Sequence, residues 1–301
     1  MIKNLESNFK NIHTKIKNSF TELEEKNNVN ISDDVWERPE GGGGNTFVLD
    51  NGNFFSNCAV NFSSIYGKEL PKAALSTKTN VSSSNGYQAM GVSVISHPNN
   101  PYVPTSHMNV RFFGILGKND NFVDWWIGGG YDLTPFLPFR EDIIEWHSSA
   151  KKLLDGYDVE YYKVFSENCN NYFQIPHRSE RRGVGGIFFD NFRDFDIEKS
   201  MIFLKSIAEC YLNSYLKIAT NRKNYEFNES EKNFQLIRRG RYAEFNLIYD
   251  RGTAFGLQSK GRIESILSSL PADAKWQYKK DKEYNVLENK LLDVINKDWN
   301  V

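Results

Sequence analysis

Histidines are the first candidates for chemistry in this chain, because only five occur among its 301 residues. His97 and His107 flank a segment that three prolines make rigid, and His147 lies on the apolar side of an expected helix. His177 directly follows Pro176. These imidazoles could act as metal ligands or as acid and base groups, or they could be unrelated structural histidines. No spacing such as His-Glu-x-x-His supports a shared metal site.

Two neighbouring segments carry polar residues at positions suited to a ligand. If residues 108–113 form a strand, Asn109 and Arg111 share one face, where the arginine could hold a carboxylate in a bidentate manner. The glycines at 128–130 would let the backbone approach a flat ligand, and they place Asp132 at the end of a strand. The plain alternatives are an exposed edge face and a turn-capping aspartate.

Arginine and glycine gather again in two later segments, residues 177–190 and 238–262. Both could bind acidic groups of a ligand, and structural ion pairs are the alternative for the first. No Walker or Rossmann pattern accompanies these residues, which favours a polycarboxylate over a polyphosphate.

Composition narrows the class of protein. Apolar residues make up 40% and charged residues 25%, as in globular proteins, and the net charge of −1 argues against a nucleic-acid partner. Cys58, Cys169 and Cys210 form no Cys-x-x-Cys pair, which fits a reducing compartment. No apolar run reaches the length of a membrane span. We therefore expect a cytoplasmic protein.

The apolar periodicity predicts an α+β fold in which a large, mostly antiparallel β-sheet is flanked by α-helices on both faces. We expect one domain over residues 1–301, with an N-terminal helix within 1–30, in which His13 is solvated, and a C-terminal helix within 280–301. Other helices are expected at Glu141–Leu154, Tyr161–Phe173, Ile197–Ile218 and Ile263–Leu270. Strands are expected at Met90–Ile95, Met108–Leu116, Phe122–Ile127, Gly186–Phe189 and, most clearly, Tyr242–Tyr249.

Taken together, these segments resemble the oxygen-dependent coproporphyrinogen-III oxidases. The resemblance extends in order from about Trp36 to Tyr278. Its motifs are Gly91-Val92-Ser93 through His97-Pro98, Asn100-Pro101-Tyr102-Val103-Pro104-Thr105-Ser106-His107-Met108-Asn109-Val110-Arg111, Trp125-Trp126-Ile127-Gly128-Gly129-Gly130-Tyr131-Asp132-Leu133-Thr134-Pro135, Gly183-Val184-Gly185-Gly186-Ile187-Phe188-Phe189-Asp190 and Glu244-Phe245-Asn246-Leu247-Ile248-Tyr249-Asp250-Arg251-Gly252-Thr253 with Glu264-Ser265-Ile266-Leu267.

This resemblance implies that the chain converts two propionates of coproporphyrinogen III to vinyl groups, with O2 as oxidant, giving protoporphyrinogen IX and two CO2. It also implies a homodimer. It assigns His107 as proton donor and His97, His107, His147 and His177 as ligands of a divalent metal. It assigns substrate binding to Ser93, Asn109, Val110, Arg111, Lys260, Gly261 and Arg262.

Two positions depart from the family pattern. Asn45-Thr46-Phe47 stands where the family usually has Arg-Ser-Arg, which places any substrate contact from that loop in doubt. Lys260 replaces the first glycine of a Gly-Gly-Arg segment, although Arg262 is kept. An added positive charge there could still suit a carboxylate.

The chemistry agrees with these residues. We expect Asp132 to accept a hydrogen bond or a proton from pyrrole N–H groups, which would make the pyrrole electron-rich enough to react directly with O2. No organic or redox cofactor is needed on this scheme. Two rival hypotheses are a non-catalytic tetrapyrrole-binding protein, which would need neither Asp132 nor His107, and a metal-dependent hydrolase that uses the four histidines.

Overall fold

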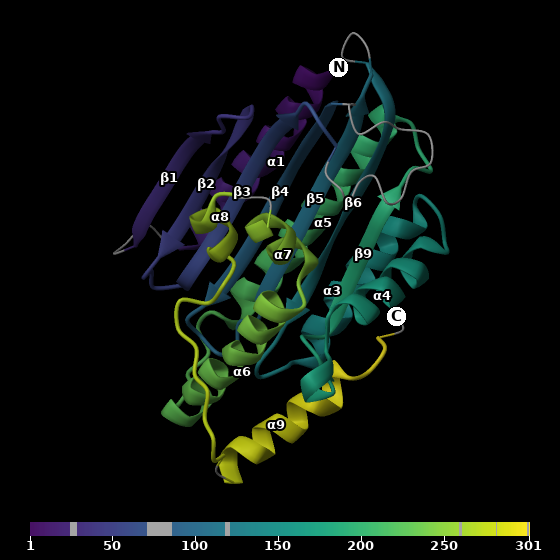
Figure 1. Ribbon diagram of the computed structural model, residues 1–301. Helices are drawn as coiled ribbons and strands as arrows, with labels where there is room; N and C mark the ends of the chain where they lie inside the picture. The colour runs from purple at the N-terminus through teal and green to yellow at the C-terminus, as the bar shows by residue number, and fades with distance from the viewer. Residues whose placement is uncertain (25–28, 71–85, 118–120, 259–260, 281, 300) are drawn as a thin grey trace.

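A broad antiparallel sheet runs through the centre of the molecule (Figure 1). The computed structural model describes residues 1–24, 29–70, 86–117, 121–258, 261–280, 282–299 and 301. Within them the main sheet has seven strands in the order β1-β2-β3-β4-β5-β6-β9, which confirms the expected α+β class. The strands are β1 (Asn30–Glu37), β2 (Gly42–Asp50), β3 (Phe55–Gly67), β4 (Gly86–Pro98), β5 (Thr105–Leu116), β6 (Phe122–Thr134) and β9 (Gly185–Phe192).

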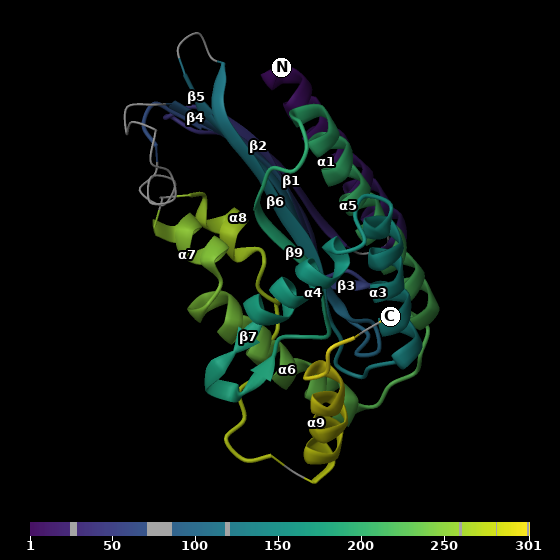
Figure 2. The ribbon, with the colours of Figure 1, turned by 90° about the vertical axis from the view of Figure 1, so that its right-hand side faces the viewer.

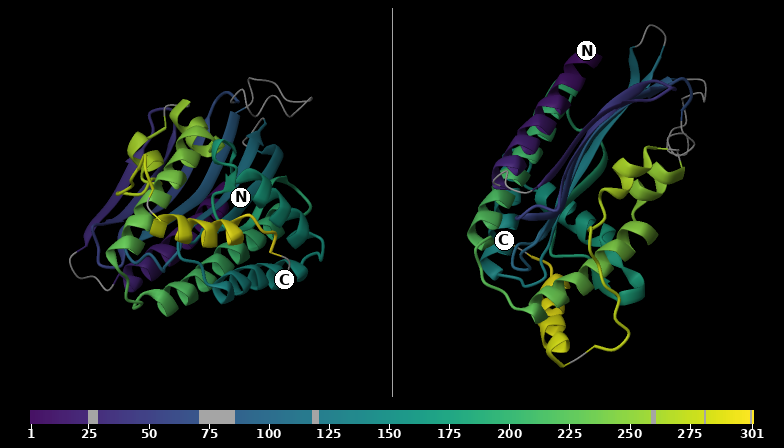
Figure 3. Two further views of the ribbon diagram at one scale, coloured as in Figure 1. Left: turned by 90° about the horizontal axis from the view of Figure 1, so that it is seen from below. Right: turned by 90° about the vertical axis from the view of Figure 1, so that its left-hand side faces the viewer.

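Helices cover both faces of this sheet, as Figures 2 and 3 show. One face carries α1 (Ile2–Leu23), α3 (Arg140–Asp155) and α5 (Ile197–Arg222). The other face carries α6 (Glu229–Ile248), α7 (Arg251–Gln258) and α8 (Ile263–Leu267). Among the described residues, no helix is long and apolar enough to cross a membrane. The remaining elements are α4 (Tyr161–Tyr172), β7 (Gln174–Ile175), the 3-10 helix η2 (Pro176–Arg178), β8 (Glu180–Arg181) and α9 (Lys282–Ile295).

The central strands separate an apolar face from a polar one. In β5, Met108, Val110 and Phe112 are fully buried in the core beneath α1 and α5. Because strand side chains alternate between faces, Asn109 and Arg111 lie on the opposite side, toward α6 and α8. The alternating side chains of β5 therefore contribute to the apolar core on one face of the sheet and to a polar surface on the other.

The strand predicted at Tyr242–Tyr249 is wrong, because these residues lie in or at the end of helix α6. A capping box starts this helix: the Asn228 side chain accepts from the Glu231 backbone, and the Glu231 side chain accepts in return. A short window of alternating apolar residues cannot distinguish a strand from a buried helix segment. In the helix, Phe245 is buried whereas Leu247 is 56% exposed, so the alternation did not mark one face.

His13 was expected to be solvated, but it is buried. It lies on α1, and its Nε2 is 3.1 Å from the backbone oxygen of Val60 in β3. Burial lowers the pKa of His13 below its usual value, although the Val60 contact opposes this effect. The neighbouring Lys15 and Lys17 had suggested that His13 lies on the solvent-exposed face of the helix. In the structure His13 lies on the buried face, like Ile12.

Candidate active site

A row of residues crosses the polar face of the sheet at its centre. Ser93 of β4 pairs with Asn109 of β5, and Asn109 pairs with Gly130 of β6. The row continues to Asn61 of β3, whose side-chain amide donates to a backbone oxygen of α8 at 3.2 Å. The side chain of Val110 points into the opposite core, so only its backbone can belong to this face.

Arg111 occupies the next position on the same face of β5. Its side chain is 47% exposed, and its Nη2 lies 2.7 Å from Oδ1 of Asp190 on β9. Gly128 of β6 lies between the two strands, opposite Arg111. The sheet thus presents a guanidinium beside the Ser93–Asn109 pair, and Asn109 and Arg111 share a face as the strand pattern predicted.

His107 and Asp132 form the next pair along β5 and β6. Nδ1 of His107 is 3.0 Å from Oδ1 of Asp132. The histidine side chain is 26% exposed, while that of Asp132 is 2% exposed. The imidazole therefore connects a buried carboxylate to the open side of the site.

Arg182 is the partner of Asp132 that the sequence interpretation did not assign. Its Nη2 donates to Oδ1 of Asp132 at 2.6 Å, and its Nε donates to Oδ2 at 3.2 Å. Burial alone would raise the pKa of Asp132, but Arg182 and His107 outweigh this effect and lower it. Both carboxylate oxygens of Asp132 therefore already have partners within the protein. These hydrogen bonds do not support the expected contact between Asp132 and the pyrrole nitrogens.

Helix α6 encloses this buried ion pair. Nη1 of Arg182 donates to Oδ1 of Asn246 at 2.9 Å. The guanidinium also lies over the rings of Phe173, Tyr242 and Phe245, at 4.0, 4.6 and 4.7 Å from their centroids. The arginine-rich segment after His177 signalled an arginine here, but its partner on β6 could not be inferred from sequence.

Arg262 lies near the other edge of the sheet, at the start of α8. It donates through Nη2 to Asp34 of β1 at 2.8 Å and through Nη1 to the Ser265 hydroxyl at 3.3 Å. Ser265 in turn lies 2.6 Å from the hydroxyl of Thr46 on β2. Gly261 donates its backbone N–H to the α7 backbone. Lys260 lies outside the described residues.

The remaining histidines have separate partners. His97 is fully buried, with Nδ1 3.1 Å from the Thr105 hydroxyl and Nε2 3.1 Å from the Ser269 backbone oxygen. Burial, with a contribution from Arg239, lowers the pKa of His97 to about 3. A neutral ring is the state that these surroundings favour.

His147 lies on α3, among buried residues. Its Nε2 is 3.0 Å from the backbone oxygen of Val184, and its Nδ1 is 3.1 Å from the Tyr162 hydroxyl. Burial lowers the pKa of His147 to about 4. Both ring nitrogens are therefore already used inside the protein.

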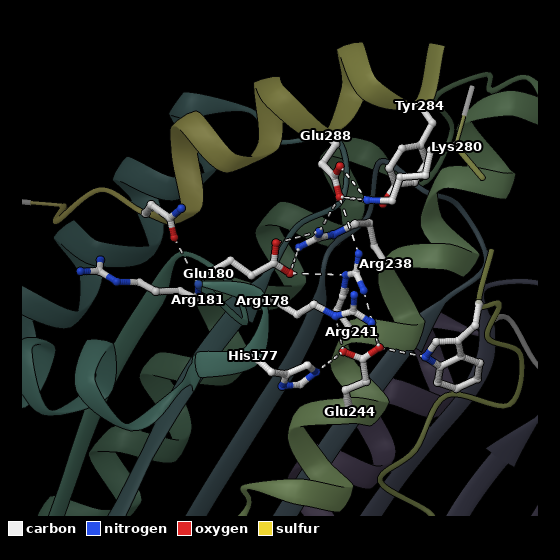
Figure 4. A network of polar contacts seen from close by, with 12 residues as sticks. His177, Arg178, Glu180, Arg181, Arg238, Arg241, Glu244, Lys280, Tyr284 and Glu288 are labelled. Carbon is white, nitrogen blue, oxygen red and sulfur yellow. Dashed lines mark hydrogen bonds and ion pairs between the residues drawn. The ribbon is translucent and has the colours of Figure 1, made fainter. Parts of the chain in front are cut away.

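His177 belongs to an ion-pair network between η2, α6 and α9 (Figure 4). Its Nε2 lies 2.7 Å from Glu244, which also receives two hydrogen bonds from Arg178, at 2.8 and 2.6 Å. The other ring nitrogen of His177 lies 2.8 Å from the Tyr249 hydroxyl. Burial would raise the pKa of Glu244, but bonds from Arg178, His177 and Trp276 lower it to about 2.

These positions do not bring the four histidines together around one ion. Both ring nitrogens of His97, His147 and His177 have partners within the protein, and His107 uses Nδ1 on Asp132. In the part of the chain that the structure describes, no group of three or more His, Cys, Asp or Glu side chains is arranged to hold a metal. The geometry therefore does not fit the shared site implied by the resemblance.

Comparison with known proteins identifies the family of this chain. A family model described as coproporphyrinogen III oxidase matches residues 4–300. The chain belongs to this family. It is 45% identical over 293 residues to the oxygen-dependent coproporphyrinogen-III oxidase of Wigglesworthia glossinidia brevipalpis, covering 97% of this chain and 95% of that protein. It is 43% identical over 303 residues to the protein of the same name from Francisella tularensis subsp. novicida (strain U112), covering 97% and 98%.

In this member of the coproporphyrinogen III oxidase family, the polar row and the His107–Asp132 pair share one face of the sheet. Arg262 lies on the same side but several strands away, because its partner Asp34 belongs to the edge strand β1. The site is thus an extended surface between sheet and helices, with cationic groups at well-separated positions.

Proposed function

We propose that this chain catalyses the oxygen-dependent oxidative decarboxylation of coproporphyrinogen III to protoporphyrinogen IX, in porphyrin and heme biosynthesis. Conversion of one propionic side chain to a vinyl group releases CO2 and removes two hydrogens, which O2 takes up as hydrogen peroxide. Two side chains react, so two O2 are consumed. The observation that carries this proposal is the juxtaposition of Arg111 and Asn109 with His107 on one face of the sheet, in a member of this family.

The spacing of the cationic groups supports a large substrate with several carboxylates. Asp34, which holds Arg262, lies four strands from Asn109 in the same row. At a strand spacing near 4.8 Å, this corresponds to about 19 Å. We assign one propionate to Ser93, Asn109 and Arg111, and a more distant one to Arg262.

Three further family-implied positions keep narrower roles in this proposal. Val110 can contribute only through its backbone, because its side chain is in the core. Gly261 fixes the turn before Arg262 through its backbone bond to α7. Lys260 is retained as a carboxylate-binding residue on the resemblance alone.

We assign proton donation to His107, because its ring is the exposed member of the buried network. Asp132 accepts from Nδ1 of His107, which fixes the ring orientation and favours a proton on that nitrogen. Arg182 keeps Asp132 ionised for this purpose. This is a different role for Asp132 from direct contact with the pyrrole nitrogens.

We further propose a cytoplasmic homodimer. Large apolar side chains are exposed along α6, α7, α8 and the segment that follows, and the family resemblance implies a homodimer. They are Leu247, Ile248, Leu257, Ile263, Leu267, Trp276 and Tyr278. Sedimentation equilibrium of the purified protein tests this: a monomer at micromolar concentration would contradict it.

The deciding experiment is aerobic incubation of the purified protein with coproporphyrinogen III, followed by protoporphyrin fluorescence after oxidation of the product. We expect product in air and none under anaerobic conditions. Binding of the substrate without turnover would instead support the non-catalytic tetrapyrrole-binding alternative. Turnover without O2 would contradict the proposed reaction class.

A further inference from the structure

Strand β9 departs from regular pairing directly beside Arg111. In the ladder between β6 and β9, Gly129 pairs with Phe189, but Ile127 pairs with Phe192. Two residues of β9, Asp190 and Asn191, therefore stand opposite Gly128 alone. This is a β-bulge, a feature that turns side chains away from their regular direction and is common near active sites.

The bulge directs the Asp190 carboxylate toward Arg111. Asn191 adopts a left-handed backbone conformation with φ of 53°, and its N–H donates to Oδ1 of Asp190 at 2.9 Å. The same oxygen lies 2.7 Å from Nη2 of Arg111. The bulge thus fixes the carboxylate that faces the guanidinium.

Gly128 makes room for this pair to cross β6. A Cβ at this position would lie 2.7 Å from Nε of Arg111 and 3.1 Å from Oδ1 of Asp190. Any side chain there would push the guanidinium away from the sheet. A glycine, a bulge and a left-handed asparagine therefore all serve the same contact between β5 and β9.

We propose that Asp190 is a positioning residue, which holds the Arg111 guanidinium across Gly128 in the orientation that receives a substrate propionate. This inference rests on the proposed function. The contact is an ion pair through Nη2 of Arg111. The other N–H donors of this guanidinium, on a side chain that is 47% exposed, can bind a ligand carboxylate.

A purely structural pair is a weaker account of these features. Half-exposed ion pairs contribute little to stability, because solvent screens them. The local irregularities around Asp190 would then have no function. A positioning role accounts for them, because small misplacements of a substrate-binding group strongly reduce turnover.

Steady-state kinetics of Asp190→Asn test the proposal. We expect kcat to fall between about 10- and 100-fold, with a smaller change in KM, because the propionate is bound but misplaced. Gly128→Ala should lower kcat in the same way while leaving every charge in place. The matched control is Asp194→Asn, whose carboxylate accepts from Tyr161 at 2.9 Å outside the site and whose kcat should be unchanged. A kcat for Asp190→Asn equal to that of the control would overturn the proposal.

A second measurement does not depend on turnover. The rate at which phenylglyoxal labels Arg111, followed by peptide mass spectrometry, reports how firmly its guanidinium is held. Asp190→Asn should label severalfold faster at Arg111 and at the wild-type rate at Arg193. Equal labelling at Arg111 would overturn the positioning role even if the wild type is active. If the wild type is inactive but Arg111 is labelled faster in Asp190→Asn, the proposed function is refuted, whereas the positioning of Arg111 by Asp190 is supported.

Discussion

The imidazole of His107 lies 3.0 Å from the carboxylate of Asp132, across directly paired positions of β5 and β6. Regular strand pairing alone holds this contact, so it needs no loop movement to form. It joins a buried anion to a partly exposed acid–base group, and this arrangement makes the two residues act as one unit.

Substitution of Asp132 by Asn should abolish most turnover. The amide can no longer favour a proton on Nδ1 of His107 through its charge, and general acid–base catalysis typically contributes a factor of about 100 to 10,000. We expect kcat to fall by at least about 100-fold. Fluorescence assays of protoporphyrin formation measure this effect.

The control is His107→Asn, which removes the exposed member and leaves the Asp132–Arg182 pair intact. It should lose similar activity but keep the wild-type melting temperature more closely than Asp132→Asn. Near-normal turnover in Asp132→Asn would exclude the proposed role of the carboxylate.

Arg182→Met should reduce the free energy of unfolding strongly. The variant leaves Asp132 buried without its cationic partner, and loss of one member of a buried ion pair typically costs about 3–5 kcal/mol. Urea unfolding at pH 7 measures the difference. The double variant Arg182→Met with Asp132→Asn should recover part of this stability without recovering activity, because no buried charge then remains unpaired.

The pH dependence of this loss follows from the lowered pKa of Asp132. Because the pKa of Asp132 is lower in the folded than in the unfolded state, its ionised form stabilises the wild type at pH values above the usual pKa of aspartate. This stabilisation is lost as pH falls through the folded-state pKa. In Arg182→Met, only His107 still opposes the effect of burial, so the pKa of Asp132 should rise and the folded state should lose less stability as pH falls. The difference in free energy of unfolding between the wild type and Arg182→Met should therefore decrease as pH falls. A difference that does not change with pH would contradict an ion pair between Arg182 and Asp132.

Much of the site could be predicted from sequence because strand periodicity has few alternatives. Once residues 108–113 were assigned to a strand, Asn109 and Arg111 had to share a face. The family motifs then added Ser93 and His107. Register between strands could not be derived, although it is the register that brings Ser93 beside Asn109.

Long-range partners were the part that sequence could not supply. Arg182 meets Asp132 only because the segment before β9 passes between β6 and α6, a contact 50 residues apart in the chain. The mistaken strand at Tyr242–Tyr249 had a different, local origin: alternation over a short window was interpreted without the helix cap at Asn228. The four histidines do not surround one ion in the described residues, because each ring has its own partner elsewhere in the chain.

Substitution of His147 by Gln should leave the divalent-metal content of the purified protein unchanged. Both ring nitrogens of His147 already bond within the protein, to Val184 and Tyr162. Elemental analysis of the wild type and the variant after identical dialysis measures this. A metal present in the wild type and lost in His147→Gln would show that α3 rearranges to bind it.

Glu244→Gln should alter the acid end of the stability profile. The pKa of Glu244 is lowered from its ordinary value of 4.5 to about 2, against the effect of burial, mainly by Arg178 and His177. Its ionised form therefore stabilises the fold above pH 4.5, and this contribution is lost as pH falls from 4.5 toward 2. The melting temperature of the wild type should fall more steeply over that interval than that of Glu244→Gln, which has no proton to take up at this position.

Thermal melting at closely spaced pH values provides the comparison, with Glu283→Gln on the first turn of α9 as a control that removes an acidic group outside the network. Parallel profiles for Glu244→Gln and the wild type would show that the network around His177 does not hold this carboxylate in solution.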